Sequence, residues 1–551
     1  MINKFLRPEG RDSFILAQDS HQLRLESRSF YARNKKNFFT LILFLVIIFS
    51  FLLRLWKSQE LFFWHVDEDI VALTIKRILV DHRPQLVGFP IPGGIYLGPL
   101  VFYLLAIPYT LSRMDPSILP YFSAILSTFT VFLVYFIGKT IFENRNIGLI
   151  AAVIYGFSFL TNVYSRIYSG LSLVGILSLL TYLFLFNLIK NKKGHNFFYL
   201  SLVLLIAVQN EGSSFSILLL SVLLWFVYRF RVDRKQLIVG MLILLVSHIP
   251  LFIFNLRHNF LTVTTLINFL SKASVAGFGH QNTAYTLIDV LNVFPQSLSR
   301  FFYVSGPNNI ATQILPCPDL IAARATQNFF IYTAALFIIC IFLVKYLFKK
   351  NRPLGESIIF FHFLVLICGL LIYNLFMIGY SYEWTLLVFF PGFSLIVASI
   401  AYEIYKRGFL QKTLILFLLS LFILLNIKLT LTSQNSFGLK AKSLAVKDSI
   451  KEIGDKSFAL DSIGSCFAQG YVYLFWYFGK EQVSSYADEW FGSGIIKPQS
   501  DARANLKVVM VNPSKKESED FFKKYLLYKA KAFKSKEIGE VEVLFLKQEE
   551  I

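Results

Sequence analysis

The sequence predicts a polytopic, all-α membrane protein with about 11 transmembrane helices, followed by a C-terminal α/β domain outside the cytoplasm. The composition is the first observation behind this prediction. The 551 residues are 55% hydrophobic and only 16% charged, whereas soluble domains carry about 25% charged residues. The second observation is that the apolar residues occur in runs of roughly 18 or more with almost no charge, such as residues 38–55 and 357–378.

The basic residues are the third observation, because they form short clusters between the apolar runs. A net charge of +20 could suggest a nucleic-acid partner. The basic residues are not gathered on one folded face, however, so we expect no nucleic acid. In membrane proteins such clusters mark the cytoplasmic side. They occupy residues 24–36, 139–145, 190–193, 229–235, 345–352 and 406–412.

The predicted spans follow from these clusters, because the chain must cross the membrane an even number of times between two cytoplasmic points. A last span then leads out of the cytoplasm and ends near residue 430. The spans before it are predicted at residues 38–55, 117–137, 146–163, 171–189, 196–209, 213–228, 236–254, 328–347, 356–378 and 384–404.

The interval between the first two basic clusters, 24–36 and 139–145, contains three apolar runs, although the number of crossings there must be even. The run that does not fit is at residues 95–111. This run follows a Pro- and Gly-rich segment at 90–94 and contains Pro99 and Pro108. Such a composition suits a juxtamembrane helix that lies at the interface without crossing. The alternative is a different pairing of the spans, with Arg113 in a short inside loop.

Three domains are expected. The polar residues 1–37 are too many for the start of a signal peptide, and no small-residue cleavage site follows the first apolar run, so that run should be a retained span. Residues 1–37 would form a basic cytoplasmic tail, and residues 38–430 a transmembrane module with extracytoplasmic loops at 56–116 and 255–327. Residues 431–551 would form the α/β domain. Its predicted helices are 441–453, 467–478 and 516–527, and its predicted strands are 458–460, 507–511 and 542–546.

The four cysteines do not form a disulfide framework. Cys340 and Cys368 lie inside apolar runs, where a thiol behaves as a small hydrophobe. Cys317 and Cys466 could form an extracytoplasmic pair. No group of histidine, cysteine and acidic residues has the spacing of a zinc site. Asp67 and Asp69 could loosely hold a divalent ion through water.

The first extracytoplasmic loop carries the residues best suited to chemistry. It has the sequence WHVDED at residues 64–69, and Lys76, Arg77 and Arg83 follow. Three adjacent carboxylates beside a span are costly unless they face water, a cation or a reacting hydroxyl. One of them could serve as general base toward an acceptor hydroxyl. The alternative is a solvated loop whose acidic residues balance its basic ones.

The order of features along the chain is distinctive. A single span is followed by an Asp-Glu pair, a Pro- and Gly-rich juxtamembrane segment, and many further spans that end in an α/β domain. This order resembles the polyprenyl-phosphate-sugar-dependent glycosyltransferases of the GT-C fold, in particular the protein O-mannosyltransferase and aminoarabinose transferase group. The resemblance covers most of residues 38–405. It implies that Asp67 is the catalytic base and that Glu68 stands beside it. It also implies that transfer needs no metal, so we expect neither a metal nor a cofactor.

Other segments are similar to the same family, but the match is incomplete. The chain has no acidic residue in 167–176, where many relatives carry one, and it has Asn210 and Glu211 where relatives often show a Gln/His-type pair. Glu211 or Asp69 could replace the second acidic contact. The similar segments are Tyr164-Ser165-Arg166, residues 254–260 (FNLRHNF), and the stretch from Tyr380 to Pro391.

The chemistry that the resemblance implies requires particular residue types. A sugar leaving a lipid phosphate needs a deprotonated acceptor, a stabilised oxocarbenium-like centre and a neutralised phosphate. Guanidinium groups can hold phosphate oxygens in a bidentate fork, although each could instead contact lipid headgroups. The candidates for the phosphate are Lys76, Arg77, Arg83, Arg166 and Arg257.

Two further groups of residues belong to the candidate site. His258 follows Arg257 and could contact substrate, or it could be a neutral ring bonded at a helix end. Tyr380, Tyr382 and Glu383 form a polar-aromatic patch. Such a patch could stack on a sugar or form part of an aromatic belt at the membrane surface.

The resemblance implies an inverting glycosyltransferase of the cell membrane. It would move a sugar from a polyprenyl-phosphate donor to a hydroxyl of a lipid, a glycan or a protein. The alternatives are a transporter or flippase of lipid-linked sugars and an inactive scaffold that binds them. Transporters usually carry ionisable groups near the bilayer midplane. Here the acidic cluster lies at the end of a span, which favours the enzyme.

Overall fold

The computed structural model describes most of the chain between Asn37 and Lys547. The described ranges are 37–91, 95–167, 169–271, 287–306, 328–349, 352–377, 383–464, 469–486, 504–511, 519–539 and 541–547. The chain divides into two units, Met1–Phe49 and Ser50–Ile551. All elements below lie in the second unit, except the first long helix, which begins in the first.

The described part of the chain is a multi-pass membrane protein. Seven of its helices are long and apolar enough to cross a bilayer. They are Asn37–Leu55, α5 (Ile118–Ile141), α8 (Ser169–Lys190), α11 (Arg234–Arg257), α15 (Phe329–Phe348), α16 (Leu354–Met377) and α18 (Phe409–Thr432). Shorter apolar helices are α4 (Leu100–Leu111), α6 (Arg145–Phe157), α9 (Asn196–Asn210), α10 (Phe215–Tyr228) and α17 (Phe390–Tyr405).

The helices confirm the predicted all-α membrane fold, with two differences in detail. The span predicted at 146–163 is divided into α6 and α7 (Phe159–Tyr164). The break falls at Ser158, whose hydroxyl donates a hydrogen bond to the Phe301 carbonyl at 2.7 Å. The span predicted at 384–404 begins later, at the start of α17, because Pro391 suits the first turn of a helix.

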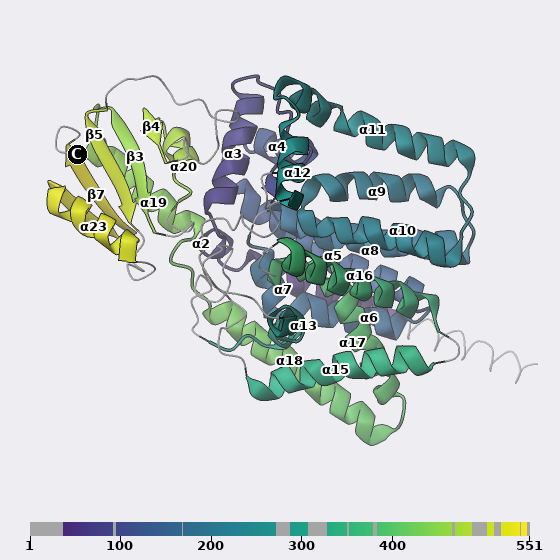
Figure 1. The fold of residues 1–551 in the computed structure, drawn as a ribbon. Coiled ribbons are helices and arrows are strands. Elements are labelled where there is room, and N and C mark those ends of the chain that lie inside the picture. Colours follow the sequence, from purple (N-terminus) through teal and green to yellow (C-terminus); the bar gives the residue numbers. More distant parts are fainter. Residues whose placement is uncertain are drawn as a thin grey trace, which may run out of the picture. The chain divides into compact units, whose positions relative to one another are not determined.

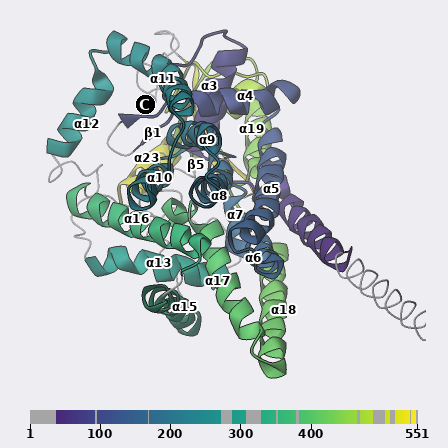
Figure 2. The ribbon, with the colours of Figure 1, turned by 90° about the vertical axis from the view of Figure 1, so that its right-hand side faces the viewer.

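The transmembrane helices pack closely. Helices α8, α9, α10 and α11 run side by side (Figure 1), and Figure 2 views the same group end-on. Helix α5 packs against both α6 and α8. At Gly148 the contact is so close that a Cβ atom would lie 2.5 Å from the Tyr135 carbonyl oxygen. Small residues of this kind let membrane helices approach one another.

The segment between the first long helix and α5 has structure of its own. It contains α2 (Ser58–Leu61), α3 (Val66–Leu79), and a short hairpin of β1 (Pro90–Ile91) and β2 (Ile95–Tyr96) before α4. Helix α4 has 12 residues, fewer than the roughly 20 that cross a bilayer. The Leu100 N–H, at its start, donates to Oε1 of Gln209 on α9 at 3.3 Å.

The segment between α11 and α15 contains two further helices. These are α12 (Leu261–Ser271) and α13 (Leu287–Phe302). Helix α13 packs against α15, α16 and α7. A 3-10 turn, η3 (Glu383–Leu386), lies ahead of α17 and contacts both α13 and the 3-10 turn η1 (Gly212–Ser214), which precedes α10.

The C-terminal domain is the predicted α/β domain. Its sheet has the order β4-β3-β5-β7-β6, with parallel pairing around β3 and antiparallel pairing of β5 with β7 and of β7 with β6. Figure 1 shows α23 and α19 beside this sheet. The elements are α19 (Leu439–Ile453), β3 (Phe458–Ile463), α20 (Val472–Tyr477), β4 (Ser484–Ser485), β5 (Leu506–Val511), α23 (Glu519–Lys531), β6 (Lys534–Ile538) and β7 (Val541–Lys547).

Candidate functional site

The three carboxylates of the first loop lie in the first turn of α3, where the helix dipole favours negative charge. The Glu68 carboxylate accepts a hydrogen bond from the His65 backbone N–H at 3.1 Å and so caps the helix start. The side chain of Glu68 is fully buried, whereas that of Asp67 is 49% exposed. Asp69 is also buried, at 1% exposure. Of these three carboxylates, Asp67 is therefore the one that a substrate can contact.

The His65 imidazole lies between two of these carboxylates. Its Nδ1 is 2.6 Å from Oε2 of Glu68, and its Nε2 is 4.0 Å from Oδ2 of Asp67. Burial opposes a charge on the ring. The charge of Glu68, its hydrogen bond to the ring and the charge of Asp67 together outweigh burial, so the pKa of His65 is raised.

A further carboxylate, that of Glu211, interacts with Asp67 from another part of the chain. Glu211 lies between α9 and η1, and its carboxylate accepts hydrogen bonds from the N–H groups of Gly212 and Ser213. Burial, followed by the negative charge of Asp67, raises the pKa of Glu211 to about 7. The pKa of Asp67 is itself raised, because partial loss of hydration and the charge of Glu68 outweigh the opposing charge of His65. The structure thus brings Glu211 within electrostatic range of Asp67.

Asp69 connects the cluster to the C-terminal domain. Its two oxygens accept hydrogen bonds from the N–H groups of Val472 and Tyr473, at 3.1 and 2.9 Å, at the start of α20. Burial raises the pKa of Asp69 to about 7, although these two donors and Lys442 oppose the shift. Asp69 therefore caps a helix of the C-terminal domain and does not face a substrate.

Lys442 brings a positive charge from the C-terminal domain to the acidic cluster. Its side chain is fully buried on α19, and its ammonium donates to the Gln469 carbonyl and lies 4.9 Å from the centre of the Tyr471 ring. Burial lowers the pKa of Lys442 to about 7, against the effect of the negative charges of Asp69 and Glu68. Sequence reasoning did not identify this residue. The feature of the sequence that could have indicated burial of Lys442 is its position three residues after Leu439 and four before Val446, on the buried face of α19.

The segment just before α3 is hydrogen-bonded both to the membrane module and to the C-terminal domain. The Phe63 N–H donates to the Arg166 carbonyl at 2.8 Å, and the Leu439 N–H of the C-terminal domain donates to the Phe62 carbonyl at 3.1 Å. Gly470 packs so closely that a Cβ atom there would lie 2.9 Å from the Trp64 carbonyl oxygen. The position of the acidic cluster therefore depends on the membrane module and on the C-terminal domain together.

The basic residues predicted to bind phosphate have different environments. Lys76 lies 3.3 Å from Asp81 and 3.7 Å from Glu481, over the Trp476 ring. Arg77 has its pKa lowered, first by burial and then by its neighbour Arg83.

Arg83 is exposed, and its backbone N–H donates to the Arg77 carbonyl. Arg166 is buried and donates to the carbonyls of Leu53 and Trp56, at 2.7 and 3.2 Å, at the end of the first long helix.

The segment around Arg257 packs beside the hairpin of the first loop. Arg257 is exposed at the end of α11. The His258 ring is stacked on Phe254 with centroids 4.1 Å apart, and its Nδ1 donates to the Phe254 carbonyl at 2.8 Å. Phe254 also contacts the Tyr96 ring of β2 edge-on at 5.3 Å. His258 is thus hydrogen-bonded at the helix end through its Nδ1.

Glu383 forms a buried network that the sequence did not predict. Its carboxylate accepts from Nε of Arg300 on α13 at 2.6 Å and from the Tyr164 hydroxyl of α7 at 2.9 Å. Because η3 contacts η1, this network lies next to the turn that follows Glu211. The only feature of the sequence that could have indicated Arg300 is its place in a strongly amphipathic helix. Tyr380 and Tyr382 fall outside the described residues.

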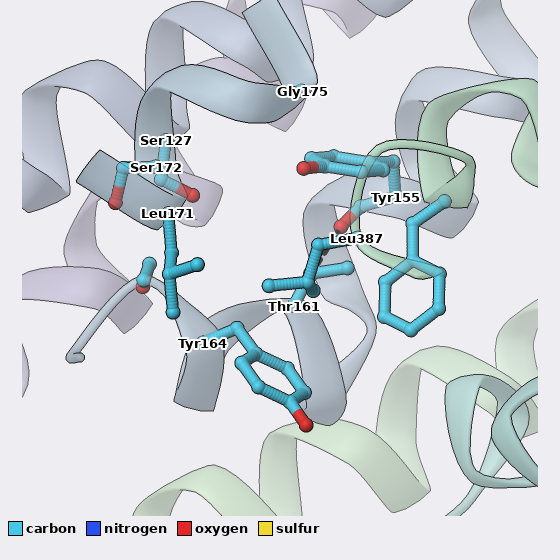
Figure 3. A pocket seen from close by; sticks show the side chains of 10 residues that line it. Ser127, Tyr155, Thr161, Tyr164, Leu171, Ser172, Gly175 and Leu387 are labelled. Carbon is cyan, nitrogen blue, oxygen red and sulfur yellow. Dashed lines mark hydrogen bonds between the residues drawn. The ribbon is translucent and has the colours of Figure 1, made fainter. Parts of the chain in front are cut away.

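A small polar cavity lies beside Tyr164 (Figure 3). Its volume is about 20 Å³, room for one water molecule and far less than a sugar needs. Hydroxyl groups dominate its lining, which consists of Ser127, Tyr155, Thr161, Tyr164, Ser165, Leu171, Ser172, Gly175, Leu387 and Phe390.

Neither a metal-binding cluster nor a disulfide is found among the described residues. Among the described residues no group of three or more histidine, cysteine and acidic side chains could hold a metal ion. Cys340 and Cys368 are not in disulfides. The proposed pair of Cys317 and Cys466 lies outside the described residues.

Comparison with known proteins identifies the fold. No family model and no curated protein sequence matches the chain. An oligosaccharyltransferase from Archaeoglobus fulgidus, solved in its apo form, superposes with a TM-score of 0.50 and 13% identity, over 87% of this chain and 70% of that one. The chain has a GT-C fold. Apo ArnT from Cupriavidus metallidurans is also similar, with a TM-score of 0.48 and 12% identity, over 93% of this chain and 98% of that one.

Proposed function

We propose that the chain is an inverting glycosyltransferase of the cell membrane, which moves one sugar from a polyprenyl-phosphate donor to a hydroxyl of a lipid, a glycan or a protein. The observation that carries the proposal is the position of Asp67. It is a half-exposed carboxylate in an otherwise buried acidic helix start, in the first loop of a GT-C fold. The donor class comes from the resemblance of the sequence to the polyprenyl-phosphate-dependent group.

In this mechanism Asp67 is the general base. Its carboxylate takes the proton of the acceptor hydroxyl as the acceptor oxygen bonds to the anomeric carbon. The bond between that carbon and the phosphate oxygen breaks on the opposite face, and its electron pair leaves with the lipid phosphate. A single displacement of this kind inverts the anomeric configuration.

The other predicted residues have supporting roles. Glu68 holds His65 and the helix start in place. Glu211 acts on Asp67 through its charge and could accept hydrogen bonds from sugar hydroxyls. Lys76, Arg77, Arg83 and Arg257 are proposed to neutralise the phosphate, since cations stabilise the negative charge that develops on the leaving group.

One observation favours the second candidate, a transporter or flippase of lipid-linked sugars. His362 lies within the membrane-spanning helix α16, where an ionisable residue is often functional. Its Nδ1 is 2.5 Å from the Tyr182 hydroxyl and its Nε2 is 3.1 Å from the Ser216 hydroxyl. Both ring nitrogens therefore have hydrogen-bond partners in the helix bundle, so a structural role accounts for the position of His362 within the membrane. The acidic cluster outside the spans favours the enzyme.

The experiment is transfer in proteoliposomes by the wild type and the Asp67→Asn variant. Asparagine keeps the size of the side chain but cannot take the proton, so we expect the transfer rate to fall by at least about 100-fold. Asp455→Asn is the matched control, because Asp455 is exposed in the C-terminal domain. A folded Asp67→Asn variant that transfers sugar at the wild-type rate would exclude Asp67 as the base.

We also propose the orientation predicted from the basic clusters. The N-terminus would be cytoplasmic, and the C-terminal domain would lie on the opposite side of the membrane. This orientation would place Asp67 and Glu211 on the extracytoplasmic side.

A further inference from the structure

We propose that His65 is a positioning residue of the transfer reaction: as an imidazolium held by Glu68, it keeps the Asp67 carboxylate ionised. This inference rests on the proposed function. The distances that carry it are 2.6 Å from Nδ1 to Oε2 of Glu68 and 4.0 Å from Nε2 to Oδ2 of Asp67. The His65 ring is 1% exposed and Glu68 is fully buried, so no shell of water weakens the contact between them, while Asp67 is half exposed on its other side.

The contacts of Nδ1 decide its protonation. The Asp67 backbone N–H lies 3.1 Å from Nδ1, as in an N-cap, and would need a lone pair there. The Glu68 carboxylate lies closer, at 2.6 Å, and needs a hydrogen on Nδ1. One nitrogen cannot do both, and the shorter, charge-assisted contact prevails. Nδ1 therefore carries a proton. The ring is an imidazolium when Nε2, the nitrogen that faces Asp67, carries a proton as well, and the negative charges of Glu68 and Asp67 favour that form.

The groups around Asp67 show why a cation is needed. Loss of hydration and the charge of Glu68 both favour protonated Asp67, and Glu211 is a further negative group in range. His65 is the neighbour whose charge opposes them. The groups that act on His65 itself are Glu68 and Asp67 on α3, which favour the imidazolium, and Lys442 on α19, which disfavours it.

The alternative is that His65 only caps α3. The His65→Asn variant separates the two roles, because asparagine is among the best N-cap residues but carries no charge. His195→Asn is the matched control: His195 is the N-cap residue of α9, is exposed, and its side chain makes no cap bond. His65→Gln is a second neutral variant, whose amide extends toward the position of Nε2.

The test is the dependence of the transfer rate on pH. Asp67 must be ionised to act as base, so the rate falls on the acidic side at the pKa of Asp67. An opposite charge at this distance lowers a carboxyl pKa by about 1–3 units. We therefore expect the acidic limb of both His65 variants to move up by about 1–3 pH units, with the alkaline plateau within a few-fold of the wild type. His195→Asn should follow the wild-type curve.

Two outcomes would overturn the inference. A lower rate at every pH with an unmoved acidic limb would show that His65 only caps the helix.

If the variants fail to assemble, ¹⁵N NMR of histidine-labelled wild type decides, because it needs no substitution. We expect one of the 8 histidines to lose its second ring proton at a pH above the usual value of about 6.5, because the pKa of His65 is raised; no histidine titrating above that value would refute the inference. A wild type without transfer activity would instead refute the proposed function.

Discussion

Asp67, Glu68 and Asp69 are adjacent residues of the same type, yet each has a different role. The difference comes from the partners of each side chain. Glu68 is fully buried and bonded to His65. Asp69 is bonded to the start of α20. Asp67 alone of the three keeps about half of its side chain exposed, at 49%.

The buried ion pair of Arg300 and Glu383 gives a prediction about stability. Arg300→Met should leave Glu383, of which 7% is exposed, with the Tyr164 hydroxyl but without its cation. Removing one partner of a buried pair costs about 3–5 kcal/mol, so the unfolding free energy in detergent should fall by about that amount. The double variant Arg300→Met/Glu383→Gln should recover much of the loss. A cost of under about 1 kcal/mol for Arg300→Met would contradict this account of the pair.

At the scale of elements, the contact between the C-terminal domain and the start of α3 is predicted to be required for activity. Gly470 has φ +96° and no room for a Cβ beside the Trp64 and His65 carbonyls, so Gly470→Ala should displace α20 from Asp69. We expect transfer to fall at least about tenfold, since small displacements of reacting groups are costly.

Gly479→Ala is the matched control for this prediction. Gly479 has φ +87°, also unfavourable for alanine, but nothing lies within 4 Å of a Cβ there. Both variants should lose about 1–2 kcal/mol of stability from backbone strain. Only Gly470→Ala should lose transfer activity, as measured at equal amounts of folded protein. Equal transfer by the two variants would show that the contact does not position the acidic cluster.

Most helices could be predicted because their apolar runs and flanking charges are local features of the sequence. The predicted spans fall on helices, and strands β3, β5 and β7 lie where predicted. Strand β6 was missed because its residues, KSKEI, are polar and three of the five are exposed. Such an edge strand is fixed by pairing with β7, which a local pattern does not show.

The candidate site was predicted in part. Asp67 and Glu211 were named from the sequence, and the structure brings them within electrostatic range. Lys442, Arg300 and Tyr164 were not assigned roles there, because their partners are far away in the chain: Tyr164 and Glu383 are 219 residues apart. Contacts of this kind follow from tertiary packing, and no spacing in one sequence indicates them.

At the scale of the whole molecule, the proposed orientation gives a prediction about accessibility. Lys451 is exposed in the C-terminal domain, and Lys192 is exposed between α8 and α9. In intact cells a membrane-impermeant thiol reagent should label the Lys451→Cys variant and not the Lys192→Cys variant. Wild type corrects for the native cysteines. The reverse pattern of labelling would invert the proposed topology.

Sugar transfer from a polyprenyl phosphate, with Asp67 as the base, is the activity that we propose for this GT-C chain. The most direct measurement presents a panel of radiolabelled polyprenyl-phosphate sugars to proteoliposomes that contain either the wild type or Asp67→Asn. We expect label from one donor to enter a new product with the wild type only. Label that crosses the bilayer chemically unchanged, equally with both proteins, would contradict the proposed transfer and support a flippase.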